Sequence, residues 1–302
     1  MTNLPTIKQL RYFIALEKYG HFGRAAEACF VSQPAFSVAI RELESVLDLQ
    51  LVDRTNKQVI MTSIGKDIAA QARLVLRDLE GLVEMASMSH APLAAELKLG
   101  IIPTIAPFLL PGLLPGLRKA FPDLKLILHE DQTQRVYDQL MEGDLDVILV
   151  ALPFELKNTE HMKLFDDPFC LAYHRNSKFI DSDDINIEGL PDHSILLMED
   201  GHCLRDHALT ACKVRNVNKV SRVTANSLLT LVQMVDSDLG ITYLPQMAVD
   251  SGLLKNTRVD TRPLKKASRR EIGLVWRRGS VRGREFELLG EHILRFRQKQ
   301  HG

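Results

Sequence analysis

Two cysteines in the second half of the sequence have the spacing of a redox pair. Cys203 follows Gly201 and His202, and Cys212 comes nine residues later. Gly201 precedes a helical pattern, so we expect Cys203 at a helix N-terminus, where the helix dipole stabilises a thiolate. His202 and Arg205 can add hydrogen bonds or positive charge. A thiolate there would attack peroxide, and the resulting sulfenic acid would condense with a second thiol.

The nine-residue spacing couples such chemistry to a change of shape. On one continuous helix the two cysteines would lie about 13.5 Å apart along the axis, whereas a disulfide needs Cα atoms within about 7 Å. The pair can bond only if the segment unwinds, which would turn thiol oxidation into a switch. The alternative is two unrelated thiols, because cysteine often serves as a small buried hydrophobic residue. For an arbitrary pair of cysteines we would favour that alternative.

Length and composition bound the function classes. The chain has 302 residues, of which 45% are hydrophobic and 25% charged, and its formal net charge is zero. This length suits two domains. Since no overall basic excess indicates nucleic-acid binding, such a function has to rest on a local motif.

The remaining bulk features exclude several kinds of site. The four cysteines lack the C-x-x-C spacing of a structural zinc site, and in a reducing cytosol they do not form a disulfide framework. We assign Cys29 and Cys170 to apolar cores, and we expect no metal and no cofactor. No signal peptide and no run of about 20 apolar residues is present, so we expect a cytoplasmic protein without membrane contact.

Residues 1–61 have the pattern of a winged helix-turn-helix. Ser32 and Pro34 mark the start of a helix that would lie in the major groove. Its polar face and the wing would contact bases and phosphates. The side chains expected to contact DNA are Ser32, Gln33, Pro34, Ser37, Arg41, Arg54 and Lys57. The alternative is an ordinary three-helix bundle with solvated polar residues.

The rest of the chain reads as a linker helix and an effector domain. Residues 62–90 carry an a/d seam that indicates a dimer contact, formed by Ile68, Ala72, Val75, Leu79, Leu82 and Ala86. Residues 91–302 alternate strands and helices, which predicts a largely parallel α/β sheet in two lobes around a ligand cleft. We place lobe I at about 96–165 plus 271–302 and lobe II at about 166–270. The expected fold class is a multidomain α+β protein.

The stretch FGRAAEACFVSQPAFSVAIRELESVLDLQLVDRT closely resembles the DNA-binding segment of LysR-type regulators. Asp48 and Val52 depart from the usual Gly and Phe of that family without threatening the fold. Nearly the whole chain is similar to the peroxide-sensing members of the family, and GHCLRD is the most specific element. The other matching stretches are LLMED, GITYLP, RREIGLVWR, IPTIAPFLLP and HEDQT.

This resemblance implies an effector domain like a periplasmic binding protein, with Cys203 as the peroxidatic cysteine and Cys212 as the resolving one. Other positions match residues that hold and polarise peroxide or support the thiol. They are Thr104, Thr133, His202, Asp206 and Arg270. Without the resemblance, Thr104 and Thr133 would be taken for strand-end caps.

The resemblance predicts a DNA-binding regulator, not an enzyme, that senses hydrogen peroxide through a reversible Cys203–Cys212 disulfide and controls oxidative-stress genes. Its expected partners are promoter DNA, RNA polymerase, a thiol reductant such as a glutaredoxin system, and further copies in a homodimer and homotetramer. Three alternatives stay open. They are a regulator with a small organic ligand in the cleft, a thiol peroxidase, and a solute-binding protein for transport.

Overall fold

A computed structural model describes residues 4–54, 59–87, 92–180, 189–211, 216–264 and 268–301. The chain divides into two compact units. The first holds residues 1–91 together with 141–144, and the second holds 92–140 and 145–302. In the described part of the chain, no helix has both the length and the apolar character needed to cross a membrane.

The first unit contains the winged helix-turn-helix that the sequence predicts. Its elements are α1 (Ile7–Tyr19), α2 (Phe22–Ala28), α3 (Gln33–Leu47) and the antiparallel pair β1 (Val52–Arg54) and β2 (Val59–Met61). Phe36, Ile40 and Leu43 of α3 are buried in its core, as their spacing predicts. Ser32 is the residue before α3, but its side chain makes no capping hydrogen bond, so Pro34 and the buried stripe carry the start of this helix.

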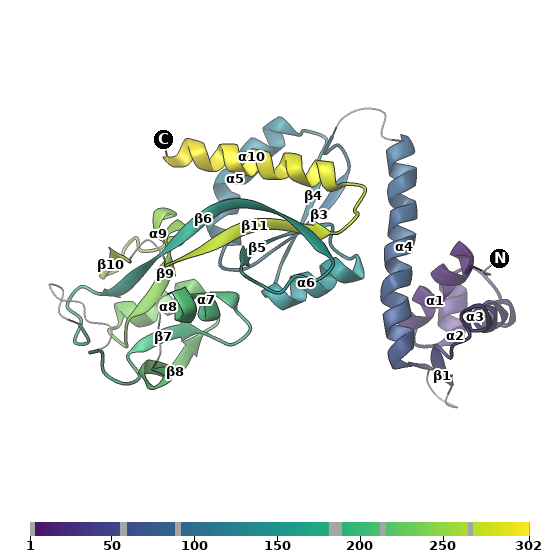
Figure 1. Cartoon of the computed structure of the whole chain (residues 1–302), viewed down its shortest axis with the longest axis horizontal. Coiled ribbons are helices and arrows are strands. Elements are labelled where there is room, and N and C mark those ends of the chain that lie inside the picture. The colour runs from purple at the N-terminus through teal and green to yellow at the C-terminus, as the bar shows by residue number, and fades with distance from the viewer. Residues whose placement is uncertain are drawn as a thin grey trace. The chain divides into compact units, whose positions relative to one another are not determined.

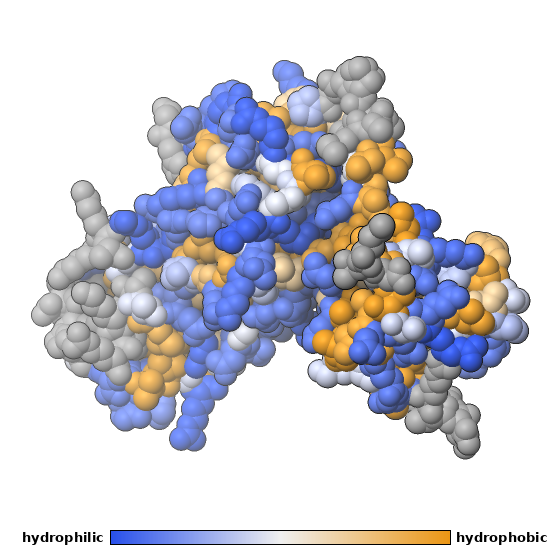
Figure 2. Space-filling view, turned by 45° about the vertical axis from the view of Figure 1, so that its right-hand side comes forward, coloured by the Kyte–Doolittle hydropathy of each residue, from blue (hydrophilic) through white to orange (hydrophobic). Residues whose placement is uncertain are grey.

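Helix α4 (Ser63–Ser87) follows the wing and has 25 residues. Ala69 and Ala72 near its start are buried, and Ala69 belongs to the core of the helix-turn-helix. Farther along, Val75 and Leu82 of the predicted seam are 42% and 58% exposed. Hydrophobic residues are visible at the surface of this unit among hydrophilic ones (Figure 2). Apolar seam positions facing solvent are what a pairing helix requires.

The second unit is built on one mixed sheet with strand order β10-β6-β11-β5-β3-β4, and β9 pairs with β6. The strands are β3 (Glu96–Ile101), β4 (Lys125–Glu130), β5 (Val147–Leu152), β6 (Thr159–His174), β9 (Thr242–Pro245), β10 (Val259–Pro263) and β11 (Arg269–Arg277). Among the described strands of this sheet, β3 pairs in parallel with β4 and β5, and the other pairs are antiparallel.

The prediction of a largely parallel sheet is therefore wrong. Strands β6 and β11 are long neighbours that both cross between the two halves of the unit, and they run in opposite directions (Figure 1). The boundaries expected near residues 165 and 270 fall inside these two strands. A separate pair, β7 (Ile195–Met198) and β8 (Val220–Ala225), is parallel.

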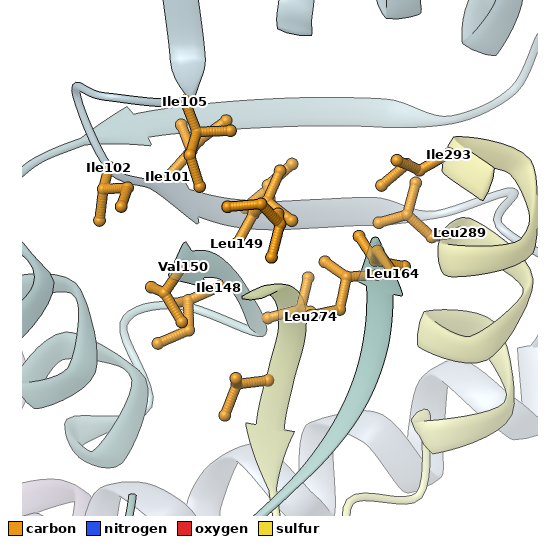
Figure 3. Close-up of a cluster of buried hydrophobic side chains, with 14 of the residues drawn as sticks. Ile101, Ile102, Ile105, Ile148, Leu149, Val150, Leu164, Leu274, Leu289 and Ile293 are labelled. Atoms are coloured by element: carbon orange, nitrogen blue, oxygen red, sulfur yellow. The ribbon is translucent and has the colours of Figure 1, made fainter. Parts of the chain in front are cut away.

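Helices cover this sheet and enclose two apolar cores. They are α5 (Ala106–Ala120), α6 (Thr133–Glu142), α7 (Cys203–Ala211), α8 (Leu228–Asp236), α9 (Gln246–Asp250) and α10 (Gly283–His301), with a 3-10 turn at Val217–Lys219. Leu289 and Ile293 of α10 extend toward the sheet residues Leu164 and Leu274 (Figure 3). Cys203, the first residue of α7, is also a member of this core.

Candidate functional site

Cys203 is the first residue of α7, as the sequence predicts. The turn before it depends on Gly201, whose φ of +93° is a conformation that residues with a Cβ rarely adopt. A Cβ at Gly201 would also lie 2.8 Å from Oε1 of Gln132. The cysteine is only 9% exposed. A tight glycine turn therefore places the thiol at the helix start and largely out of water.

A cavity of about 580 Å³ opens beside this cysteine. One wall is a single face of α7, because residues at spacings of three, four and seven lie on one side of a helix. The other walls come from α6, from the segment after β5 and from the start of β11. The lining residues are Thr133, Gln134, Pro153, Phe154, Gly201, Cys203, Asp206, His207, Thr210 and Arg269.

The environment of Cys203 favours the thiol over the thiolate. Burial raises the pKa of Cys203, and the charge of Asp206 raises it further, whereas the Thr133 hydroxyl and the charge of Arg270 lower it. The burial effect is the largest, so the expected stabilisation of a thiolate by the helix dipole does not decide the state of this thiol. That expectation considered only the local helix and not the walls around it. The Thr133 hydroxyl oxygen is buried and makes no hydrogen bond of good geometry with the described residues.

Arg270 is the centre of a buried polar cluster. Its Nε donates to Oδ2 of Asp167 at 3.0 Å, and its terminal nitrogens donate to the Thr104 hydroxyl at 2.8 Å and the Thr104 carbonyl at 2.9 Å. The other oxygen of Asp167 accepts the Met247 backbone N–H at 3.0 Å. Thr104 and Arg270, both singled out from the sequence, are thus in direct contact. The cluster supplies a fixed positive charge close enough to lower the pKa of Cys203.

The other sequence-predicted residues occupy different surroundings. His202 is buried, and burial lowers its pKa while Glu199 opposes that shift. Asp206 is exposed at the cavity edge. Thr104, His202 and Arg270 are not part of the cavity wall. Cys212 lies outside the described residues.

Sequence reasoning missed several participants. Asp167 is the acidic partner of Arg270, and His207 and Phe154 line the cavity. The spacing of four between Cys203 and His207 was a usable signal, because such residues share a helix face. Asp167 gave no local signal, since its partner is 103 residues away.

Most of the residues expected to contact DNA lie on α3 or directly before it. Gln33 and Arg41 are exposed and Ser37 is half-buried, at intervals of four residues on one face. Ser32 and Pro34 are exposed at the start of this helix. Only the backbone of Arg54 is described, in β1, and Lys57 lies outside the described residues.

The two remaining cysteines differ from Cys203. Cys170 lies in the core around β6, as expected, where its thiol donates to the Leu244 carbonyl at 3.3 Å. Burial is the main cause that raises the pKa of Cys170 to about 12. Cys29 packs against the helix-turn-helix core, and burial raises its pKa as well. Unlike Cys203, neither thiol lines the cavity beside α7.

Known protein families match both units. The LysR substrate binding domain matches residues 90–298, and the bacterial regulatory helix-turn-helix protein, lysR family, matches residues 7–66. The HTH-type transcriptional regulator EstR of Acinetobacter baylyi is 35% identical, with 100% of both chains covered. The DNA-binding transcriptional dual regulator OxyR of Escherichia coli is 39% identical over 95% of this chain and 94% of its own.

Solved structures of OxyR proteins are similar to this chain in both fold and sequence. A full-length OxyR from Pseudomonas aeruginosa with one cysteine replaced by aspartate has a TM-score of 0.77 and 37% identity, and 96% of this chain and 95% of that one are covered. An OxyR from Corynebacterium glutamicum, with a cysteine replaced by serine and with hydrogen peroxide bound, has a TM-score of 0.65 and 32% identity. The match covers 99% of this chain and 95% of that one.

Proposed function

Because the chain belongs to the LysR family of bacterial transcription regulators, we propose that it senses hydrogen peroxide through Cys203 and controls oxidative-stress genes. The observation that carries this proposal is the placement of Cys203. Its thiol is at the start of α7, beside a cavity that is lined by Thr133 and close enough to Arg270 for that charge to lower its pKa. Relatives named OxyR, one of them bound to hydrogen peroxide, support it.

In the first step the Cys203 thiolate attacks one oxygen of hydrogen peroxide. A sulfur–oxygen bond forms, the oxygen–oxygen bond breaks, and the departing hydroxide takes up a proton to become water. Thr133 lies on the cavity wall and can hold the peroxide, whereas Thr104 acts through Arg270, whose charge it orients. His202 supports this wall from its buried position beside Cys203, and Asp206 tunes the charge of the thiol.

In the second step the Cys212 thiol attacks the sulfenic acid of Cys203, which releases a second water and leaves a disulfide. The intact helix opposes this step. From Cys203 to Ala211 it rises by about 12 Å. One further peptide step spans about 3.8 Å, so no chain neighbour of Ala211 comes within the about 7 Å that a disulfide allows. Oxidation therefore requires α7 to unwind.

Unwinding α7 would alter the second lobe and, through a dimer and tetramer, the spacing of the DNA-binding units on the promoter. The exposed seam of α4 is the surface that would pair two copies. RNA polymerase would respond to the changed DNA contact, and a thiol reductant such as a glutaredoxin would reset the disulfide in the cytoplasm.

The test is a titration of the reduced full-length protein with hydrogen peroxide, followed by mapping of thiols and disulfides by mass spectrometry. We expect a Cys203–Cys212 bond at low oxidant and none in Cys203→Ser. Cys170→Ala is the matched control, since that thiol is buried in a core away from the cavity, and it should leave the bond unchanged. Unmodified Cys203 at full oxidant would overturn the proposal.

A second candidate function is recognition of a small organic ligand in the same cavity. Its volume of about 580 Å³ lies in the range of ordinary small-molecule pockets and exceeds what a peroxide molecule needs. A ligand-induced change in promoter binding that survives in Cys203→Ser would favour this candidate.

A further inference from the structure

His207 stands one helical turn after Cys203 and has no part in the two chemical steps above. It is only 8% exposed, yet its ring lines the cavity. Its Nε2 lies 2.9 Å from the carbonyl oxygen of Pro153. A carbonyl oxygen can only accept a hydrogen bond, so Nε2 carries the proton and donates it.

This hydrogen bond joins two separate parts of the unit. Pro153 directly follows β5, in the half of the sheet whose core contains Leu149 and Leu152. His207 belongs to α7, which follows β7. The contact spans 54 residues of sequence. It therefore ties the helix that carries Cys203 to the opposite wall of the cavity.

The tie acts on the face of α7 that carries the reactive thiol. Cys203, His207 and Thr210 have the spacing of one helix face, and all three line the cavity. A helical side chain leans toward the N-terminal turn, so the His207 ring extends toward the turn that starts with Cys203. Fixing this ring fixes the position of Cys203 relative to Pro153 on the other side of the cavity.

We propose that His207 is a positioning residue for Cys203, because its Nε2–H holds α7 against the Pro153 carbonyl while its ring stays neutral. The inference rests on the proposed peroxide function and adds to it a residue that sets how fast Cys203 is oxidised. Protonation of His207 as the pH falls also makes α7 easier to release.

The neutral state follows from the surroundings of the ring. Its Nδ1 is buried and has no hydrogen-bond partner among the described residues, so a proton there would be unsolvated. Burial is the main cause that lowers the pKa of His207, and the charge of Arg270 on β11 adds to it. The Pro153 carbonyl and the charge of Asp206 on α7 act in the opposite direction.

The sign of the pH effect follows from this lowered pKa. Once released into water, His207 would titrate near its ordinary value of about 6.5 and would bind a proton more readily than in the held state. As the pH falls through that value, the equilibrium shifts from the held helix to the released one.

The experiment uses the reduced full-length protein with His207→Gln and His207→Leu. Glutamine keeps an N–H donor that can reach a carbonyl but does not titrate, whereas leucine removes the donor. The rate of Cys203 oxidation by hydrogen peroxide is followed between pH 5.5 and 8 by trapping the sulfenic acid, and thermal unfolding is recorded in parallel.

At pH 7.5 we expect His207→Leu to be slower by about three- to tenfold, which corresponds to about 0.7–1.4 kcal/mol and lies within the range for the loss of one hydrogen bond. His207→Gln should stay within about twofold of the wild-type rate. On lowering the pH below about 6.5, the wild-type rate should fall more steeply than that of His207→Gln, because only the wild type loses the tie as well as the thiolate.

A wild-type rate in His207→Leu, or identical pH profiles in the wild type and His207→Gln, would overturn this inference and leave the proposed function intact. If His207→Leu does not fold, the pH profile of His207→Gln decides alone. A wild-type Cys203 that hydrogen peroxide does not oxidise at any pH would instead remove the proposed function itself.

Discussion

Arg270 and Asp167 stand opposite each other on the antiparallel strands β11 and β6, and their side chains form a salt bridge of 3.0 Å that is almost fully buried. The strand register sets this pair, and both terminal nitrogens of the guanidinium also donate to Thr104. A buried charge needs such compensation, because desolvation of an unpaired ion is costly. The pair fixes the position of the Arg270 guanidinium, whose charge lowers the pKa of Cys203.

Asp167→Asn should destabilise the protein strongly, because it leaves the Arg270 charge buried without a counterion. We expect the free energy of unfolding to fall by about 3–5 kcal/mol in denaturant titrations. Asp166→Asn is the matched control, since Asp166 pairs with Lys163 and Arg269 at the surface, and it should cost less than about 1 kcal/mol. Equal losses in the two variants would contradict the importance of burial.

Asp206→Asn should make Cys203 more acidic. The Asp206 charge raises the pKa of Cys203, so its removal lowers that pKa and increases the thiolate fraction at neutral pH. Site-resolved alkylation rates across pH should show the titration of Cys203 at lower pH than in the wild type. The control is Asp200→Asn, because the Asp200 carboxylate pairs with Arg205 at 2.9 Å. This variant should leave the pKa of Cys203 unchanged. If Cys203 titrates at higher pH in Asp206→Asn than in the wild type, this prediction is wrong.

Arg41→Ala should weaken binding to the specific promoter by about 1–3 kcal/mol if Arg41 reads a base. Arg41 is exposed on the face of α3 that carries Gln33. Lys18→Ala removes a charge from α1 instead, and it should change specific binding far less. Footprints and titrations at two salt concentrations would measure both variants. An unchanged footprint for Arg41→Ala would take this residue off the reading face.

Leu82→Glu should weaken self-association through α4. Leu82 is 58% exposed on the predicted seam, and a charge there opposes burial against a partner helix. Val83 is 66% exposed but lies off the seam, so Val83→Glu serves as the control. Sedimentation at several concentrations should show dissociation of Leu82→Glu alone. If both variants keep the wild-type mass, α4 does not pair copies through this seam.

Gly240→Ala should destabilise the protein by about 1–3 kcal/mol through overpacking. A Cβ at Gly240 would lie 2.5 Å from the Ser194 carbonyl oxygen and 2.9 Å from Leu196, where backbone cannot move aside. At Gly116, inside α5, the nearest atom to a new Cβ is 3.6 Å away. Gly116→Ala should therefore stabilise the helix, by up to about 1 kcal/mol. Thermal unfolding of the two variants would show opposite shifts.

Several features of this protein were readable from short stretches of sequence. The buried stripe of α3 and the placement of Cys203 directly after a glycine turn both followed from spacing and backbone preference. Such signals are local, because helix periodicity and a left-handed glycine are specified within a few residues. The family resemblance then joined these local signals into one fold with two units.

Only the tertiary structure decided the rest. The sheet is mixed because β6 and β11 run in opposite directions between the two halves, and neither strand alone records its neighbour. The same folding places Asp167 against Arg270 and Pro153 against His207. It also buries Cys203 enough to raise its pKa against the helix dipole. Burial and pairing depend on which distant segments meet, and no local pattern of residues carries that information.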